Sequence, residues 1–233
     1  MKEDNEPTEF TSSADFMSSF LTRHRPQQEA LDHFASVPWL NAYLSDPAYR
    51  AIPTFSRHLK NTGEDYFFSR TINTPLTIPH MVSLQRRDFQ TPEPTSNGPD
   101  QHVSGEARHK VKTVVPAQPD ALMLLRLGGP GVDGHPKTMH GGVTCAILDE
   151  TMGLLVMLHD NNVRHTGNRN ALYTANLNVS YRGPILTPGH VLVRTWLVKR
   201  QGRKWYSKGQ IVDENGNVLA EADGLWVTVK ENL

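Results

Sequence analysis

A pair of glycines followed by an acidic residue is the part of this chain best suited to chemistry. His140-Gly141-Gly142 opens a segment that is apolar on nearly every side, and Asp149 places a carboxylate inside that segment. Paired glycines lower helix stability, and a carboxylate among apolar side chains is costly unless it is paired or protonated. Neither feature helps folding, so the pattern indicates a chemical role for both.

The start of such a helix could stabilise an oxygen that becomes negative during a reaction. The first backbone amides of a helix have no acceptor within it, and the positive end of the helix dipole lies behind them. Asp149 could serve as a base, but the usual helical rise places it about 12 Å along the axis from Gly141. Two antiparallel helices across a two-fold axis can direct both groups at one atom, so we expect a homo-oligomer with composite sites.

Hydrophobic periodicity predicts the elements that position these residues. We expect a strand at 121–127, a helix at 141–158, and four antiparallel strands at 171–181, 191–198, 204–212 and 218–229. In the first of these four, strict alternation puts Thr174 on the face opposite the apolar one. A helix that is apolar all round needs cover all round, so we predict an α+β fold in which a curved antiparallel sheet wraps one central helix.

The beginning of the chain is predicted to be a polar and helical extension, residues 1–60, attached to a domain formed by 61–233. Residues 1–25 are expected to be mobile, with helices following from Pro26 to Val37 and from Trp39 to about Asp46. Within the domain, 66–84 could supply a strand or two. Segment 88–108 is dense in turn-forming residues and is predicted to be a long exposed loop.

Composition narrows the class of protein. Lysine plus arginine equals aspartate plus glutamate at 24 each, so no overall field attracts nucleic acid or an anionic membrane. The single cysteine, Cys145, excludes an intramolecular disulfide and fits a reducing compartment. The first residues are acidic and lack arginine, and the longest apolar run, 153–158, is far shorter than a membrane span. We expect a cytoplasmic protein without a membrane span, and a mitochondrial location stays open.

Two motifs in this order resemble hotdog-fold acyl-CoA thioesterases of the PaaI-like group. His140-Gly141-Gly142, six further residues and Asp149 match that group in type and spacing, and the stretch 173–184 is similar to its strand after the helix. The resemblance covers roughly 119–229, and residues 1–60 do not share it. It implies a hotdog fold, an acyl-CoA substrate hydrolysed to a free acid and coenzyme A, no metal or redox cofactor, and a dimer or dimer of dimers.

The resemblance also implies roles for single residues. Gly141 would donate its amide to the thioester carbonyl, Asp149 of the facing subunit would act as general base or nucleophile, and Thr174 would position the attacking water. Many relatives carry asparagine or glutamine six residues before the histidine, but Gly134 stands there, so His140 is the candidate for the second donor. Substrate contacts are assigned to Gly142, Asn176, Arg182, Arg203 and Lys204, the arginines and lysine facing the phosphates of coenzyme A.

Structural explanations compete with these roles. The glycines could simply allow close packing, and Asp149 could be a buried carboxylate satisfied by its neighbours. Glu150 points about 100° away around the helix, toward solvent or a partner chain. Cys145 within an apolar helix is expected to be a small core residue.

Other functions also compete. His135 and His140 have no third ligand at a recognised spacing, so no metal site is expected. Without a Gly-x-Ser-x-Gly motif, an α/β-hydrolase is not expected either. The rivals that stay open are a hotdog hydratase or dehydratase acting on an acyl thioester, and a non-catalytic acyl-CoA binding protein.

Overall fold

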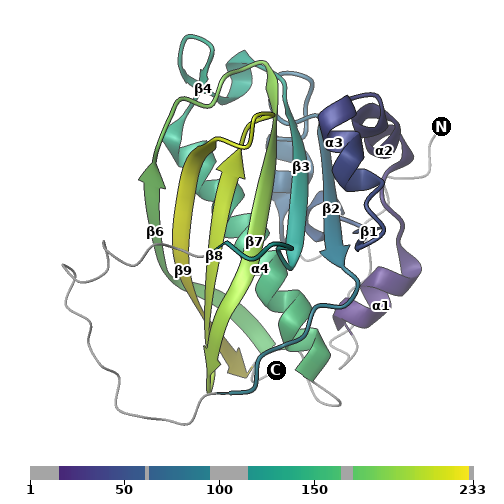
Figure 1. The fold of residues 1–233 in the computed structure, drawn as a ribbon, viewed down its shortest axis with the longest axis vertical. Coiled ribbons are helices and arrows are strands. Elements are labelled where there is room, and N and C mark those ends of the chain that lie inside the picture. The colour runs from purple at the N-terminus through teal and green to yellow at the C-terminus, as the bar shows by residue number, and fades with distance from the viewer. Residues whose placement is uncertain (1–15, 61–62, 95–114, 164–169, 231–233) are drawn as a thin grey trace.

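A seven-stranded antiparallel sheet curves around one long helix (Figure 1). The computed structural model describes residues 16–60, 63–94, 115–163 and 170–230. Neighbouring strands follow the order β1-β2-β3-β7-β8-β9-β6. Their bounds are β1 Tyr49–Ile52, β2 His80–Arg86, β3 Ala121–Leu127, β7 Gly189–Gln201, β8 Lys204–Val212, β9 Val218–Lys230 and β6 Asn170–Tyr181. The predicted α+β hotdog fold, a curved sheet around a central helix, is confirmed.

The central helix is α4, Gly141–Val163. Ile147, Leu148, Met152 and Leu155 are completely buried in the main core, which they share with side chains of β3, β7, β8 and β9. Among the described residues, α4 is the one helix long and apolar enough to cross a membrane by length and composition alone. The sheet that wraps it supplies the cover that a helix apolar on all sides requires.

Two helices cover the outer face of the sheet. These are α2, Gln28–Ala35, and α3, Pro38–Leu44. Phe34 and Leu40 have no exposed surface and anchor the two helices in a second apolar cluster. The sheet contributes to this cluster the residues Tyr49, Val82, Leu84, Leu122, Leu124, Leu192 and Val212. The predicted helices of the extension therefore form, and they shield the convex side of the sheet.

The extension also contributes an edge strand. β1 pairs antiparallel with β2, so that Tyr49 lies opposite Arg86 and Ile52 lies opposite Ser83. The division of the chain at residue 60 stays a prediction. Backbone pairing nevertheless makes part of 1–60 continuous with the main sheet.

Some elements differ from those predicted. Residues 16–23 form the helix α1, Phe16–Arg23, where a mobile polar segment was expected. Met17 and Phe20 explain the difference, because both are buried in the main core. A small hairpin of β4, Asp133–His135, and β5, Thr138–Met139, precedes α4 and was not predicted.

The structure also describes region 66–84 and the first part of the predicted loop 88–108. Region 66–84 supplies one strand, β2, after a π-helical turn at Phe67–Thr71. Residues 89–94 have no regular secondary structure, as predicted for loop 88–108, but Phe89 is buried in the main core where an exposed loop was expected. Positions 95–108 of that loop lie outside the described residues.

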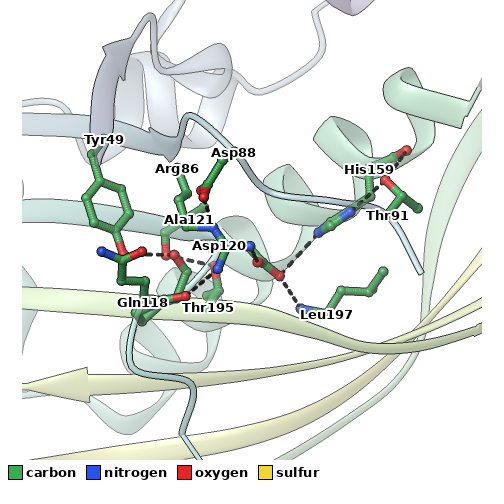
Figure 2. Close-up of polar contacts among 11 residues, drawn as sticks. Tyr49, Arg86, Asp88, Thr91, Gln118, Asp120, Ala121, His159, Thr195 and Leu197 are labelled. Atoms are coloured by element: carbon green, nitrogen blue, oxygen red, sulfur yellow. Dashed lines mark hydrogen bonds and ion pairs between the residues drawn. The ribbon is translucent and has the colours of Figure 1, made fainter. Parts of the chain in front are cut away.

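A buried polar network fixes the later part of α4 (Figure 2). The two ring nitrogens of the fully buried His159 lie 2.9 Å from Thr91 Oγ1 and 3.3 Å from Asp120 Oδ2. Asp120 also accepts a hydrogen bond from the Leu197 amide at 2.9 Å and pairs with Arg86 at 3.2 Å. One carboxylate thereby ties α4 to β2, β3 and β7.

Candidate active site

The start of α4 is capped by a histidine. The Gly142 amide donates a hydrogen bond to Nδ1 of His140 at 2.9 Å. Because Nδ1 accepts, the neutral imidazole carries its proton on Nε2 and can donate it elsewhere. His140 also explains Gly134, since a Cβ at that position would lie 2.9 Å from His140 Cδ2. The His140 ring therefore lies against the backbone of Gly134, where a larger side chain would collide with it.

Gly141 begins the helix, and its amide has no acceptor within it. A Cβ at this position would lie 3.1 Å from the Tyr181 hydroxyl. That hydroxyl donates to the Gly141 carbonyl at 3.0 Å and lies 3.0 Å from the Cys145 sulfur. The contact with Cys145 is the main cause that raises the pKa of Tyr181 above its ordinary value. Gly142 differs from Gly141, because its own amide is engaged by His140.

Tyr181 was not identified from the sequence, and Cys145 has surroundings that were not expected. Cys145 is half-buried and contacts a phenol, whereas a small core residue was predicted. Tyr181 closes the predicted strand and is followed by Arg182-Gly183-Pro184. Its position was the available signal. Tyr181 ends the strand that directly follows α4, and a strand that runs back along the helix brings its last residue to the start of that helix.

Asp149 and Thr174 meet within one chain. The Thr174 hydroxyl donates to Asp149 Oδ1 at 2.8 Å. Asp149 is half-buried on α4, and Thr174 is exposed on β6, the last strand of the sheet. The carboxylate therefore keeps one oxygen fixed by a hydroxyl while it lies beside an uncovered sheet edge.

A β-bulge explains how Thr174 reaches α4. Thr174 pairs with Trp226 and Asn176 pairs with Leu225, so Ala175 has no partner and the alternation shifts by one residue. Before the bulge, Thr174 faces α4; after it, Leu177 packs against the main core. The sequence-based prediction that Thr174 lies on the face opposite the apolar one is therefore wrong.

Glu150 lies against the N-terminal part of the chain, whereas solvent or a partner chain was expected. Burial raises the pKa of its carboxyl above the ordinary value, and the Ser56 hydroxyl and the charges of Lys60 and Arg57 partly oppose this. Arg57 is itself buried, which lowers its pKa to about 10. The residue after Asp149 thus connects α4 to the segment that follows β1.

The remaining predicted substrate contacts do not meet Asp149 within one chain. Arg182 donates through Nε and Nη2 to Glu221 Oε1, at 3.0 and 2.5 Å. Asn176 is exposed and, by alternation with Leu177, faces away from the core. Arg203 and Lys204 lie where β7 ends and β8 begins. Figure 1 shows this turn at the end of the sheet opposite the start of α4.

The described residues hold no group of three or more His, Cys, Asp or Glu side chains arranged to bind a metal ion. The site in one chain therefore consists of a helix start with His140 and Gly141, and a carboxylate with a hydroxyl, Asp149 and Thr174. It offers hydrogen-bond donors at one end and a basic oxygen further along the same helix.

Comparison with known proteins agrees with the resemblance. Residues 136–220 match the family model described as Thioesterase superfamily. The match contains both His140-Gly141-Gly142 and Asp149, as well as Thr174.

Curated relatives are similar over about half of the chain. An uncharacterized mitochondrial membrane protein, FMP10 of Saccharomyces cerevisiae, is 30% identical over 118 residues, 50% of this chain and 46% of that protein. The acyl-coenzyme A thioesterase THEM4 of Bos taurus is 31% identical over 102 residues, 43% of this chain and 38% of that protein. The match thus spans less than half the length of these relatives.

Solved structures are similar over about half of the chain. The BH2602 protein of Bacillus halodurans, crystallised with CoA, has a TM-score of 0.39 and 22% identity, covering 46% of this chain and 66% of that one. Zebra fish thioesterase superfamily member 2 has a TM-score of 0.41 and 13% identity, covering 50% of this chain and 79% of that one.

Proposed function

We propose that this protein is an acyl-CoA thioesterase that hydrolyses the thioester to a free acid and coenzyme A. The observation that carries the proposal is the hydrogen bond from Thr174 to Asp149, on a helix whose first amide, that of Gly141, has no acceptor within the helix. A carboxylate held by a hydroxyl can take a proton from water, and a helix start can stabilise an oxyanion. The names of the THEM4 relatives support the same substrate class.

The proposed site is built from two chains. Gly141 and Asp149 lie about 12 Å apart along α4, too far to act on one carbonyl. β6 is an edge strand of 12 residues, and exposed backbone edges of this length are normally covered. Antiparallel pairing of two β6 edges across a two-fold axis would place the Gly141 end of one α4 near Asp149 of the other. A homodimer, or a dimer of such dimers, is therefore part of the proposal.

In this mechanism each group has one role. The Gly141 amide, with Nε2–H of His140, donates to the thioester carbonyl oxygen. Asp149 of the facing subunit accepts a proton from water that Thr174 helps to position, and the water oxygen attacks the carbonyl carbon. Collapse of the tetrahedral intermediate breaks the carbon–sulfur bond, and the coenzyme A thiolate leaves and takes the proton that Asp149 had accepted from water.

The same dimer gives Arg203 and Lys204 a role. In one chain the turn between β7 and β8, which carries both residues, lies at the sheet end opposite the start of α4 (Figure 1). Antiparallel pairing would bring them from the partner toward the Gly141 end, where they can contact the phosphates of coenzyme A. Arg182 also lies near this end, but Glu221 already engages its guanidinium.

A panel of acyl-CoA substrates tests the proposal, with release of coenzyme A followed by a thiol reagent. The wild-type protein should turn over at least one chain-length class, and Asp149→Asn should remain folded and dimeric but lose nearly all turnover. Asp88→Asn, on an exposed carboxylate, is the matched control and should keep full activity. Affinity without turnover would instead indicate a binding protein, and loss or gain of water across an acyl double bond would indicate a hydratase.

The location of the protein is a separate prediction. The sequence favours the cytoplasm, while the similar yeast protein is named as mitochondrial. Imaging of the full-length protein with a C-terminal tag decides between the two.

A further inference from the structure

Three histidines from three different elements meet where α2 lies on the sheet. His33 of α2 and His190 of β7 place their Nε2 atoms 2.9 Å apart. The His33 ring also stacks on His80 of β2, with centroids 4.3 Å apart and an interplanar angle of 24°. All three side chains are half-buried. Nothing in the proposed hydrolysis uses them.

An arginine completes the cluster. Register places His80 opposite Arg126, and Arg126 opposite His190, so these side chains form a row on one face of β2, β3 and β7. Arg126 donates to the Gly189 carbonyl at 3.1 Å, which keeps its charge beside the imidazoles. His33 of α2 lies over this row. Three imidazoles and one guanidinium, all of which can carry a positive charge, therefore lie together where α2 contacts the sheet.

The contact between His33 and His190 requires a neutral partner. One Nε2 must carry a proton and the other must offer its lone pair, so the hydrogen bond can exist while at least one ring is unprotonated. A second proton would place two N–H groups face to face beside Arg126. The bond would be lost, and like charges would repel across the helix–sheet interface.

We propose that His33, His80 and His190 form a pH-dependent clasp that holds α2 on the outer face of the sheet and releases it on acidification. Release would uncover the apolar outer face beneath α2, which includes Val82 and Leu124. A second histidine contact supports the idea. His24, directly after α1, packs on His58 with ring centroids 4.5 Å apart, so both α1 and α2 meet the rest of the chain through histidine pairs.

The neighbouring charges set the direction of the effect. Burial, together with Arg126 and the other two histidines, lowers the pKa of His190 to about 4 from 6.5. Burial, His80 and Arg126 lower the pKa of His33, while Glu29 opposes this. For His80, burial again lowers the pKa; Glu29 opposes it, while Arg126 and Arg57 act with burial.

The sign of the pH dependence follows from these shifts. An imidazole whose pKa is lower in the docked form than in the released form favours docking at pH values above 6.5. That contribution is lost as the pH falls from 6.5 toward 4. If the released imidazole has the ordinary pKa of 6.5, protonation of His190 shifts the equilibrium between docked and released α2 by at most about 30-fold between pH 8 and pH 5.

A metal ion is a less suitable explanation of the cluster. The rings of His33 and His80 are nearly parallel and stacked, so their in-plane lone pairs cannot point at one ion. The part of the chain that the structure describes also holds no arrangement of three ligands suited to a metal. The experiment includes a chelator for this reason.

Hydrogen exchange of the full chain, corrected for the intrinsic effect of pH, tests the clasp. Protection of 28–35 should fall, by up to about 30-fold, between pH 8 and pH 5 relative to β8, with or without EDTA. His190→Gln and His33→Gln, which do not titrate, should remove most of this fall. His135→Gln, an exposed histidine in β4, is the matched control and should behave like the wild type.

Several results would overturn the proposal. These are equal pH dependence of 28–35 and β8, a wild-type profile in both glutamine variants, or loss of protection at neutral pH on adding EDTA. If either variant does not fold, titration of the imidazole signals in the wild-type protein by NMR replaces it. A pKa near 4 for His190 supports the clasp, and ordinary values near 6.5 for all three histidines contradict it.

Discussion

At the scale of single residues, Thr174 has a contact that only a hydroxyl can make. It donates to Asp149 at 2.8 Å, and its γ-methyl contributes nothing to that bond. Thr174→Val, which keeps the shape of the side chain, should lower kcat by roughly 10- to 100-fold with little change in KM. Steady-state kinetics on the best acyl-CoA substrate measures both constants.

The control for this change is Thr174→Ser, which restores the hydroxyl and should recover most of the activity. Full activity in Thr174→Val would show that the hydroxyl has no part in catalysis. Loss of activity in the serine variant as well would mean that the methyl group, through packing in β6, is what matters.

His140 has a structural role that can be separated from catalysis. Its Nδ1 accepts the Gly142 amide, as the side chain of a helix N-cap does. His140→Ala should therefore lower the free energy of unfolding by about 1 kcal/mol, whereas His140→Asn should preserve most of it. Urea denaturation measures the difference, and His135→Ala, on an exposed side chain, should leave stability unchanged. Equal stability of the alanine and asparagine variants would contradict a capping role.

At the scale of elements, the long periodic segments could be predicted and the local irregularities could not. The apolar helix and the four strands after it are confirmed because their apolar residues repeat regularly. The bulge at Ala175 reverses the face of Thr174, and no residue type in 173–177 marks it. α1 was missed because its apolar residues, Met17 and Phe20, stand among polar neighbours and are buried only by distant parts of the chain.

The residues of the candidate site divide in the same way, into those that local spacing identifies and those that depend on contacts between distant segments. Local spacing was enough to single out Gly141 and Asp149, because both lie on one helix. Tyr181 and the partners of Glu150 depend on contacts between segments far apart in sequence, which spacing alone does not reveal. The pairing of Arg182 with Glu221 was missed for the same reason, since it requires the register of β6 and β9.

The network around Asp120 makes a prediction about how α4 is held (Figure 2). Asp120→Ala would leave His159, Arg86 and the Leu197 amide without their shared acceptor. Unfolding free energy should fall by about 2 to 4 kcal/mol, because buried donors would lose their partner. Chemical denaturation measures this loss. Asp88→Ala, an exposed carboxylate on the same Arg86, should cost little, and equal losses in the two variants would contradict the argument.

At the scale of the whole molecule, the N-terminal helices are part of the folded structure. Phe34 and Leu40 are completely buried against the outer sheet face, so each alanine variant should lower the free energy of unfolding by about 2 to 5 kcal/mol. Tyr43→Ala, on the exposed side of α3, is the control and should cost far less. Thermal and urea denaturation provide the measurement. Unchanged stability in Phe34→Ala would mean that the extension folds independently of the sheet.

The proposal that two chains build each site has a direct test by mixing two inactive variants. Gly141→Pro removes the amide at a helix position where proline is tolerated, and Asp149→Asn removes the base. In a mixed dimer, one site carries both changes, while the other combines Gly141 of one chain with Asp149 of its partner and is intact.

Random exchange of subunits should therefore restore about a quarter of the wild-type activity, because half of the dimers are mixed and each has one working site. Mixed dimers are quantified by native mass spectrometry, and each variant alone, taken through the same exchange, is the control. If Gly141 and Asp149 served a site within one chain, every site would carry one of the two changes. Mixed dimers without activity would then show that the two groups do not act across the interface.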